Sequence, residues 1–260
     1  MACGLKGFIV RNLVKTFYKL AISGKTNSII TENIYDKELI NSLNAVNDNQ
    51  IKIIRGAGVD LSQYEYKEEN NENIKVSMAC RLLKDKGVFE YIEAAKLLKQ
   101  KFPNVEFELY GDIDIYNPAS LTEDDIEKIK QDGFVKVYGF SNDIAKVFSD
   151  ANIVVLPSYR EGLPKVLIEA TACGRAVVTT DVPGCRDAIE PNVTGLLCKV
   201  KDSKSLTSMI EKLIINNKLR NSMGKEGRKL AQQEFDIHKV VEKHFEIYEG
   251  KPMIILNGEF

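Results

Sequence analysis

Short apolar runs alternate with amphipathic stretches along most of the chain. Eight runs have the length and aliphatic content typical of strands: residues 28–31, 51–55, 74–80, 105–111, 135–140, 151–158, 176–180 and 194–200. Several of them, such as "ANIVVLPS" at 151–158, are continuously apolar rather than alternating. Strands that are buried on both faces show this pattern, so it predicts the interior of a parallel sheet.

Helical periodicity fills the gaps between the predicted strands. Residues 87–102 place apolar side chains at helical spacing. Two further helices are predicted with capping residues at their starts, Ser141 or Asn142 for 141–150 and Ser203 or Ser205 for 203–214. The polar run 64–73 predicts a loop. Because strands and helices alternate, we expect an α/β fold with a doubly wound, Rossmann-like parallel sheet.

The predicted elements form one full domain and a smaller N-terminal piece. Residues 56–250 hold the alternating pattern and have the length of an ordinary domain. Residues 1–55 predict a helix, a strand and a helix, which is too little to enclose a separate core. We therefore expect them to be the remnant of a second domain or a flap on the main one, and residues 251–260 to be a tail.

Composition narrows the classes of function. The net charge of -1 gives no global reason to bind nucleic acid. No apolar run is long enough to span a membrane, and the lysines and arginine of the first twenty residues interrupt any secretion signal. The five cysteines show no C-x-x-C spacing, so reduced thiols are expected rather than a zinc site or disulfides. His238 and His244 would lie on different faces of a helix, which argues against a metal pair.

The N-terminal segment is basic. The first 31 residues contain five basic side chains and no acid, and Arg11, Lys15 and Lys19 repeat on one helix face. A basic amphipathic helix over residues 6–20 is able to lie on an anionic membrane surface. The alternative, which the shortness of the basic face favours, is an ordinary helix that packs its apolar side on a sheet.

The segment "YREGLPKVLIEATACG" that follows the strand 151–158 predicts an anion site. Pro164 suits the first turn of a helix, and Gly174 suits the position just past its end. The amides of Gly162, Leu163 and their successors then stand at a positive helix start, which favours a phosphate. The segment also lies at the carboxyl end of a strand, where open α/β sheets bind ligands.

Two glutamates bracket this predicted helix start. Glu169 lies five residues beyond Pro164, roughly 7–8 Å along the helix axis. A carboxylate accepts two hydroxyl protons, which fits a ribose diol at Glu169. Glu161, beside the expected phosphate, is placed to accept hydroxyls of a sugar beyond it. The pattern therefore predicts a site for a nucleotide diphosphate that carries a sugar.

Two cations are expected at the same edge of the sheet. Arg81 follows the strand 74–80, and Lys86 stands just before the helix that begins near Gly87. Fixed positive charges there would stabilise a diphosphate as it leaves with its bonding electrons. A competing signal, Asp112-x-Asp114, matches a metal-binding pattern, but it follows a strand and a glycine turn, and we expect no metal there.

These segments resemble a known family. "ACRLLKDKG", "VYGFSNDIAKVFSDANIVVLPSYREGLPKVLIEATACGRAVVTTDVPG" and "NVTGLL" are similar to the donor-binding half of retaining glycosyltransferases of family 4, which have the GT-B fold. "GAGVD" at 56–60 resembles the hinge-side turn of that family. The likeness covers about residues 26–250 and is greatest to bacterial transferases of capsule, O-antigen or lipid-linked oligosaccharide assembly.

The resemblance implies roles for the matching residues. Glu161 would contact the donor sugar, Glu169 would hold the ribose, and Arg81 and Lys86 would hold the diphosphate, beside the Gly162–Pro164 turn. It further implies a UDP-linked hexose or N-acetylhexosamine donor, a saccharide or lipid-linked acceptor, and transfer with retention and without a metal cofactor. Separately from the resemblance, the reduced cysteines favour a cytoplasmic location, and the basic helix allows peripheral contact with the inner face of the cytoplasmic membrane.

The sequence departs from the family before Gly56. A complete GT-B enzyme has a whole acceptor domain there, and an active-site histidine of that half has no counterpart here. Three hypotheses stay open: a transferase, a donor-binding subunit or inactive fragment that needs a separate acceptor-domain chain, and an epimerase or phosphorylase of the same fold. Under the second, an exposed apolar face on residues 8–22 and 236–249 is expected to mark the docking surface.

Overall fold

The structure, a computed structural model, describes residues 5–24, 27–70 and 72–250. The chain divides into a larger unit, Gly56–Val240, and a smaller unit that joins the described residues before Gly56 to those from Val241 onward. The division at Gly56 coincides with the start of the predicted main domain, whereas the other boundary falls before the predicted end at residue 250. The expected tail, residues 251–260, lies outside the described residues.

The larger unit is built on a six-stranded parallel sheet in the order β5-β4-β3-β6-β7-β8. This is the doubly wound order in which the chain first adds strands on one side of β3 and then returns to add them on the other. The predicted α/β fold is therefore confirmed, with strands inside the expected ranges. They are β3 (Lys75–Ala79), β4 (Glu106–Tyr110), β5 (Lys136–Gly139), β6 (Ile153–Leu156), β7 (Ala176–Thr180) and β8 (Gly195–Cys198).

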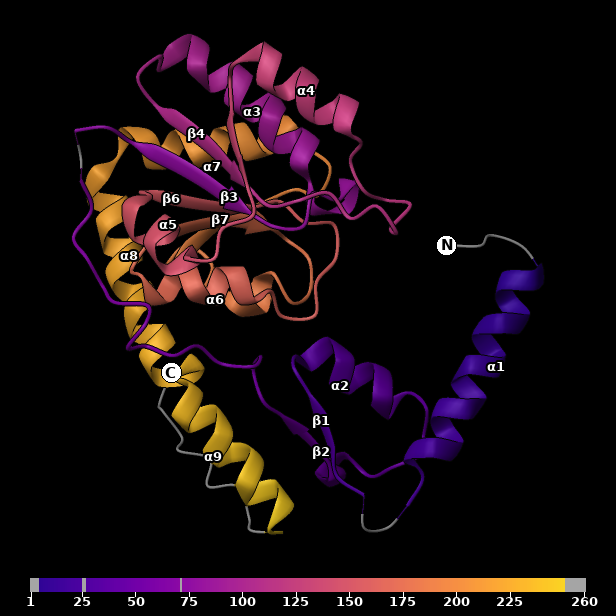
Figure 1. The fold of residues 1–260 in the computed structure, drawn as a ribbon. Helices are drawn as coiled ribbons and strands as arrows, with labels where there is room; N and C mark the ends of the chain where they lie inside the picture. Colours follow the sequence, from indigo (N-terminus) through magenta and orange to yellow (C-terminus); the bar gives the residue numbers. More distant parts are fainter. Residues whose placement is uncertain (1–4, 25–26, 71, 251–260) are drawn as a thin grey trace. The chain divides into compact units, whose positions relative to one another are not determined.

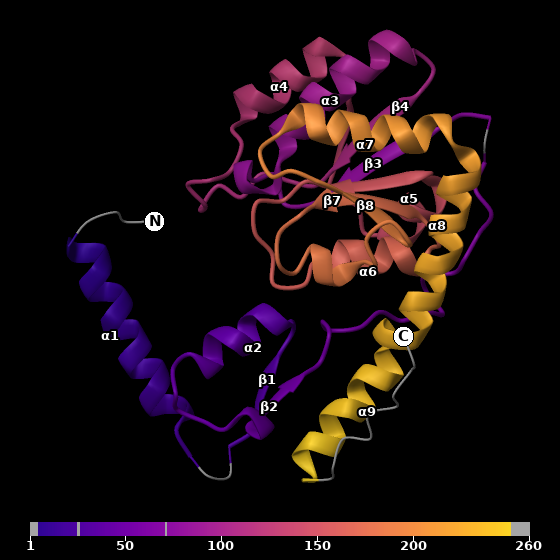
Figure 2. The same cartoon turned by 180° about the vertical axis from the view of Figure 1, so that it is seen from behind.

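Helices cover both faces of this sheet. In both views α3 and α7 lie on one face, and α5 and α6 lie on the other (Figures 1 and 2). The helices of the larger unit are α3 (Val88–Lys101), α4 (Glu123–Asp132), α5 (Ile144–Asp150), α6 (Lys165–Ala172), α7 (Ser203–Ile215) and α8 (Asn217–Leu230). Helix α9 (Ile237–Tyr248) begins in this unit and continues into the smaller one. Short helical turns also occur at Lys84–Lys86, Arg186–Ala188 and Ala231–Phe235.

The centre of the sheet is buried on both faces. Every residue of β6 and β7 is buried; β6 is wholly aliphatic, as its sequence predicts, whereas β7 ends in two buried threonines, Thr179 and Thr180. A second cluster packs α6 against the end of α8 and includes Val59, Ile168 and Phe235. Both faces of α6 are thereby held, which fixes the helix whose start the sequence singles out.

Two helix caps differ from the prediction. Asp143 caps α5 by accepting the Lys146 amide at 2.9 Å, and Asp202 caps α7 by accepting the Ser205 amide at 2.8 Å. The predicted caps, Ser141 or Asn142 and Ser203 or Ser205, are wrong. In each case the aspartate is the residue immediately before the first helical one, so its carboxylate reaches the free amides of the first turn.

The N-terminal part of the smaller unit, before Gly56, contains a helix, a strand, a helix and a second strand. They are α1 (Leu5–Ile22), β1 (Ile29–Thr31), α2 (Ile34–Asn41) and β2 (Ile51–Ile53), with a short turn at Asp48–Gln50 before β2. The two strands pair in parallel. Asn33 caps α2 by accepting the Asp36 amide at 2.8 Å. The described residues before Gly56 thus have the elements predicted for 1–55, together with the predicted strand at 51–55.

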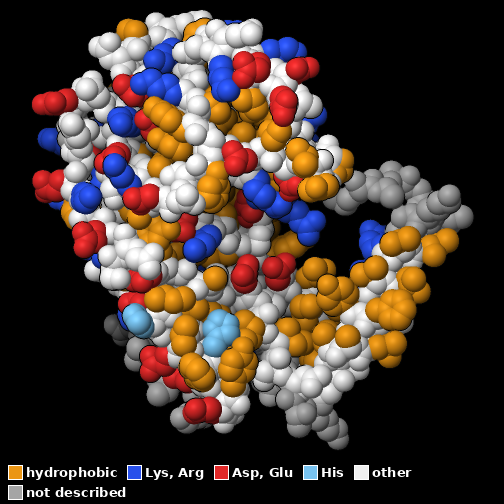
Figure 3. Space-filling view, viewed as in Figure 1, with side chains coloured by type: hydrophobic (Ala, Val, Ile, Leu, Met, Phe, Trp, Pro, Cys, Tyr) orange, Lys and Arg blue, Asp and Glu red, His pale blue; other side chains and the backbone are white. Residues whose placement is uncertain are grey.

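Helix α1 presents both of its faces to solvent. All side chains from Phe8 to Ala21 are exposed, and Figure 3 shows hydrophobic side chains along the helix. Within the smaller unit, the apolar side of α1 is therefore not covered by the strands β1 and β2. None of the helices in the described part of the chain is long and apolar enough to cross a membrane.

Candidate functional site

The topology brings the predicted site segments to one edge of the sheet. Strands β3 and β6 are parallel neighbours at the point where the strand order reverses, so their carboxyl ends lie side by side. Arg81 and Lys86 follow β3, and Glu161 follows β6. A crevice outside the carboxyl ends at such a switch point is where doubly wound sheets bind nucleotides.

Lys86 and Glu161 form an ion pair across this switch point. Lys86 Nζ lies 2.6 Å from Glu161 Oε1, and their side chains are only 18% and 13% exposed. The two residues are 75 positions apart in sequence. A charge-assisted contact at this distance restrains both side chains. The Lys86 ammonium group and the Glu161 carboxylate are therefore both fixed at the crevice.

Backbone contacts fix the two loops that carry this pair. The Tyr159 amide and the Ser158 hydroxyl both donate to the Asp85 carbonyl, at 2.8 and 3.2 Å. On the other side, Gly184 has a φ of +68°, and an added Cβ would lie 2.1 Å from the Gly162 carbonyl oxygen. Only glycine fits such a position, so the loop around Glu161 rests directly on the backbone of the next loop.

The start of α6 lies one residue later than predicted. Pro164 is the N-cap, with extended backbone, and Lys165 is the first helical residue. The amides of Lys165 and Val166 therefore have no carbonyl one turn earlier in the helix, whereas the Leu167 amide bonds to the Pro164 carbonyl at 3.0 Å. The donors for an anion at this helix start are thus displaced toward Lys165 and Val166, because Pro164 carries no amide hydrogen.

Glu169 lies on α6 and is largely buried. Its Oε1 accepts the Tyr64 hydroxyl at 2.6 Å and lies 3.3 Å from Lys165 Nζ. The residue is only 6% exposed. The sequence identified the glutamate but missed the tyrosine, which is 105 positions away in the chain. The structure does not pair Glu169 with Glu161, Arg81 or Lys86 among the described contacts.

Arg81 stands apart from the Lys86–Glu161 pair. Its side chain is 65% exposed, and its nearest carboxylate is Asp114, at 3.5 Å. Asp112, the other half of the D-x-D pattern, accepts the Phe140 amide at 3.1 Å. Within residues 5–24, 27–70 and 72–250, no three metal-ligating side chains cluster as they would around an ion. Each of the two aspartates is thus engaged by a neighbour on the protein.

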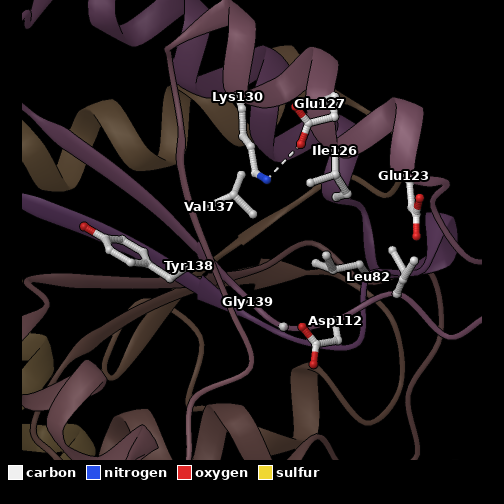
Figure 4. Close-up of a pocket in the computed structure, with 11 residues that line it drawn as sticks. Leu82, Asp112, Glu123, Ile126, Glu127, Lys130, Val137, Tyr138 and Gly139 are labelled. Atoms are coloured by element: carbon white, nitrogen blue, oxygen red, sulfur yellow. Dashed lines mark hydrogen bonds and ion pairs between the residues drawn. The ribbon is translucent and has the colours of Figure 1, made fainter.

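Two cavities open at this end of the sheet. One, of about 460 Å³, is mainly apolar and extends from Arg81 to Val166 in the first turn of α6. The second, of about 480 Å³, lies between α4 and β5 and shares Gly111, Asp112 and Ile113 with the first. Figure 4 shows the second, where Lys130 points to Glu127 on the same helix. The first cavity is the one that adjoins the predicted anion site.

The cysteines near the crevice are poor nucleophiles. Cys80, Cys173, Cys185 and Cys198 are unpaired, while Cys3 lies outside the described residues. Burial raises the pKa of the Cys80 thiol to about 12 and that of Cys185 to about 11. Neither thiol supplies a thiolate at neutral pH, so the chemistry of the site falls to the glutamates and the cations.

Comparison with known proteins agrees with the family resemblance seen in the sequence. A family model described as glycosyl transferases group 1 matches residues 62–230. The Campylobacter jejuni N,N'-diacetylbacillosaminyl-diphospho-undecaprenol alpha-1,3-N-acetylgalactosaminyltransferase is 31% identical over 95% of this chain and 66% of its own length. The Staphylococcus aureus capsular polysaccharide biosynthesis glycosyltransferase CapM is 30% identical over 85% of this chain and 58% of its own length.

The fold also has close counterparts among solved structures. The Anabaena HepE protein in complex with UDP-glucose superposes with a TM-score of 0.74 and 22% identity, over 91% of this chain and 68% of that one. The chain spans about two thirds or less of the length of the curated relatives named above. The matched family model covers well over half of the 260 residues and includes every residue of the crevice. The chain therefore belongs to the group 1 glycosyltransferase family, with a Rossmann-like domain of the GT-B type.

Proposed function

We propose that the chain binds a nucleotide-diphosphate sugar, with UDP as the expected nucleotide, and transfers the sugar with retention to a saccharide or lipid-linked acceptor. The observation that carries the proposal is the meeting of Lys86, Glu161 and the start of α6 at the switch point. A helix start and a lysine both attract a diphosphate. In support, HepE was solved with UDP-glucose, and the Campylobacter relative is named as an N-acetylgalactosaminyltransferase.

Each group in the crevice receives one role in this proposal. The diphosphate is assigned to Lys86, to the exposed Arg81 and to the amides from Leu163 into the first turn of α6. Glu161 is assigned to the hydroxyls of the donor sugar, a hexose or N-acetylhexosamine, and Glu169 to the ribose. The mainly apolar cavity between Arg81 and α6 suits the base, because a flat heterocycle is best held by apolar walls.

The proposed reaction breaks the bond between the anomeric carbon and the diphosphate oxygen. The electron pair of that bond leaves with the diphosphate, whose charge Lys86, Arg81 and the helix amides stabilise, so no metal cofactor is proposed. The acceptor oxygen bonds to the anomeric carbon on the face that the diphosphate leaves, and its proton passes to the departing phosphate oxygen. Glu161, beside the sugar, stabilises the positive charge that develops on the ring.

Binding of the acceptor substrate is proposed to involve residues outside the larger unit. Exposed apolar and basic side chains alternate around α1, including Phe17, Arg11 and Lys15. We propose peripheral contact of residues 6–20 with the inner face of the cytoplasmic membrane, where a lipid-linked acceptor would be presented. A second candidate function is a donor-binding subunit that needs an acceptor-domain partner chain, and the exposed apolar side chains of α1 support it as a docking surface.

Calorimetric titration with UDP, GDP and ADP tests the donor site. The expected result is binding of UDP in preference to the other two, with transfer or slow hydrolysis when a labelled UDP-sugar is supplied. Binding without turnover that is restored by a separate acceptor-domain chain would select the second candidate. Failure of all three nucleotides to bind at millimolar concentration would contradict the proposal.

A further inference from the structure

An irregular segment, Tyr64–Asn70, is tied firmly to the larger unit although it contains no regular secondary structure; we call it the strap. At its start, Arg228 Nη1 donates to the Tyr64 carbonyl at 2.6 Å and to the Ala172 carbonyl at 2.7 Å. Ala172 is the last residue of α6. One arginine therefore joins the backbone of Tyr64 to the end of the helix that carries Glu169.

The rest of the strap is anchored by buried charged groups. Arg175 Nη2 donates to the Lys67 carbonyl at 2.5 Å. Further along, Glu69 accepts Arg220 Nε at 2.7 Å and Asn152 Nδ2 at 2.8 Å. The side chains of Arg220 and Glu69 are only 1% and 5% exposed. Because both ends of the strap are fixed in this way, the position of the Tyr64 side chain is set before any ligand arrives.

From this fixed position the Tyr64 hydroxyl donates a hydrogen bond to the Glu169 carboxylate. It donates to Oε1 at 2.6 Å, and its ring packs against both apolar clusters of the larger unit. Burial and the neighbouring Glu169 carboxylate raise the pKa of Tyr64 above its usual value. The phenol therefore stays protonated and acts as a hydrogen-bond donor across the physiological range.

The contact engages one oxygen of Glu169 and leaves the other open. Oε1 faces the Tyr64 hydroxyl and, at 3.3 Å, Lys165 Nζ. In the described part of the chain Oε2 accepts no hydrogen bond, and it is not one of the fully buried atoms that lack a partner, so it reaches solvent. A carboxylate oxygen accepts two hydrogen bonds, so Oε2 alone is able to take both hydroxyls of a ribose.

We propose that Tyr64 is a positioning residue for the nucleotide: by holding Oε1, it turns Oε2 of Glu169 toward the ribose. The inference rests on the proposed function, because it assumes that Glu169 receives the ribose of a bound nucleotide. It goes further by assigning a role to a side chain outside the crevice and to the strap that fixes it.

A ligand-based cycle separates positioning from a structural role. Tyr64→Phe removes only the hydroxyl, and Tyr66→Phe, two residues along the strap, is the matched control. Each variant and the wild-type chain are titrated with UDP and with 2′,3′-dideoxy-UDP, which lacks the ribose hydroxyls. Thermal unfolding of the three proteins is compared so that any loss of folded protein is detected.

The expected loss for Tyr64→Phe is about 3- to 10-fold in UDP affinity, the usual range for one hydrogen bond. Its affinity for the dideoxy compound should fall by less than about twofold, because two groups that act through each other show non-additive losses. Tyr66→Phe should bind both compounds like the wild-type chain.

Three results would overturn the inference. Equal losses for both compounds would give Tyr64 a merely structural role. Unchanged UDP affinity in Tyr64→Phe, alongside a loss in Glu169→Ala, would remove Tyr64 from the site and leave the proposed function intact. Absence of UDP binding by the wild-type chain would refute the proposed function itself.

Discussion

Glu161 and Glu169 lie eight positions apart in sequence, yet the protein holds them in opposite ways. Glu161 sits in a loop and is neutralised by Lys86 at 2.6 Å, whereas Glu169 sits on α6 and receives the uncharged Tyr64 hydroxyl. The Lys165 contact with Glu169 is longer, at 3.3 Å, and that lysine is 63% exposed. The comparison indicates two different tasks for two residues of the same type.

The difference matters for the proposed reaction. A diphosphate that enters the crevice must share Lys86 with Glu161, which is feasible because an ammonium group has three donors. Glu169 needs no such exchange, because its second oxygen is open before the nucleotide binds. We therefore expect Glu161 to act mainly on the transfer step and Glu169 mainly on ground-state binding.

The largest effect is expected for Glu161→Gln. Removing one preorganised charge next to the reacting centre typically lowers turnover by about 100- to 1000-fold. Affinity for UDP, which lacks the sugar, should change by less than about threefold, since the glutamine keeps the shape and a hydrogen-bonding group. Turnover of a labelled UDP-sugar and calorimetry with UDP measure the two quantities. Comparable losses in turnover and in UDP affinity would contradict the proposal that Glu161 acts mainly on the transfer step.

Next in size is the effect of Gly184→Ala on stability. The left-handed backbone and the overlap of Cβ with the Gly162 carbonyl should together lower the free energy of unfolding by about 2–4 kcal/mol. Gly133→Ala is the matched control, because its φ is +71° but its nearest neighbour is 4.0 Å away. Only the strain of about 1 kcal/mol is expected there. Urea denaturation measures both, and equal values would show that the loop contact is not tight.

Glu169→Ala should act on binding rather than turnover. Loss of a hydrogen bond to a charged group predicts a UDP affinity about 10- to 100-fold lower. Glu226→Ala, which removes a carboxylate paired with Lys229 on α8, is the control and should bind UDP like the wild-type chain. Calorimetry with UDP decides the point, and an unchanged affinity for Glu169→Ala would take this residue away from the ribose.

The smallest effect is expected for Arg81→Gln. Because the Arg81 side chain is 65% exposed, water and salt screen its attraction for a diphosphate, and a loss of about 3- to 10-fold in UDP affinity is expected. The salt dependence of UDP binding should also become shallower. A loss larger than that of Lys86→Gln, measured side by side, would reverse the proposed ranking of the two cations.

Much of the fold could be predicted from the sequence, because buried strands of a parallel sheet consist largely of aliphatic residues. The same local logic identified Glu161, Glu169 and the helix that begins near Pro164. It placed the caps of α5 and α7 wrongly because serine, asparagine and aspartate all cap helices, and only the backbone decides which one stands at the first turn.

Contacts between distant parts of the chain were beyond the reach of local patterns. Tyr64 lies at the start of a polar run that indicates only a loop, and its partner Glu169 is 105 positions away. The strap likewise receives hydrogen bonds from three arginines that are distant in sequence, and no local pattern predicts these contacts. They are Arg175, Arg220 and Arg228. Nor does the sequence reveal which cation pairs with Glu161: in the structure it is Lys86, while Arg81 faces Asp114.

A crystal structure of the chain with bound UDP would show where each part of the nucleotide lies. We expect the diphosphate at Lys86 and the first amides of α6, with the ribose hydroxyls on Oε2 of Glu169 and the Tyr64 contact to Oε1 retained. A nucleotide bound away from the carboxyl ends of β3 and β6, or a ribose that does not touch Glu169, would contradict this expectation.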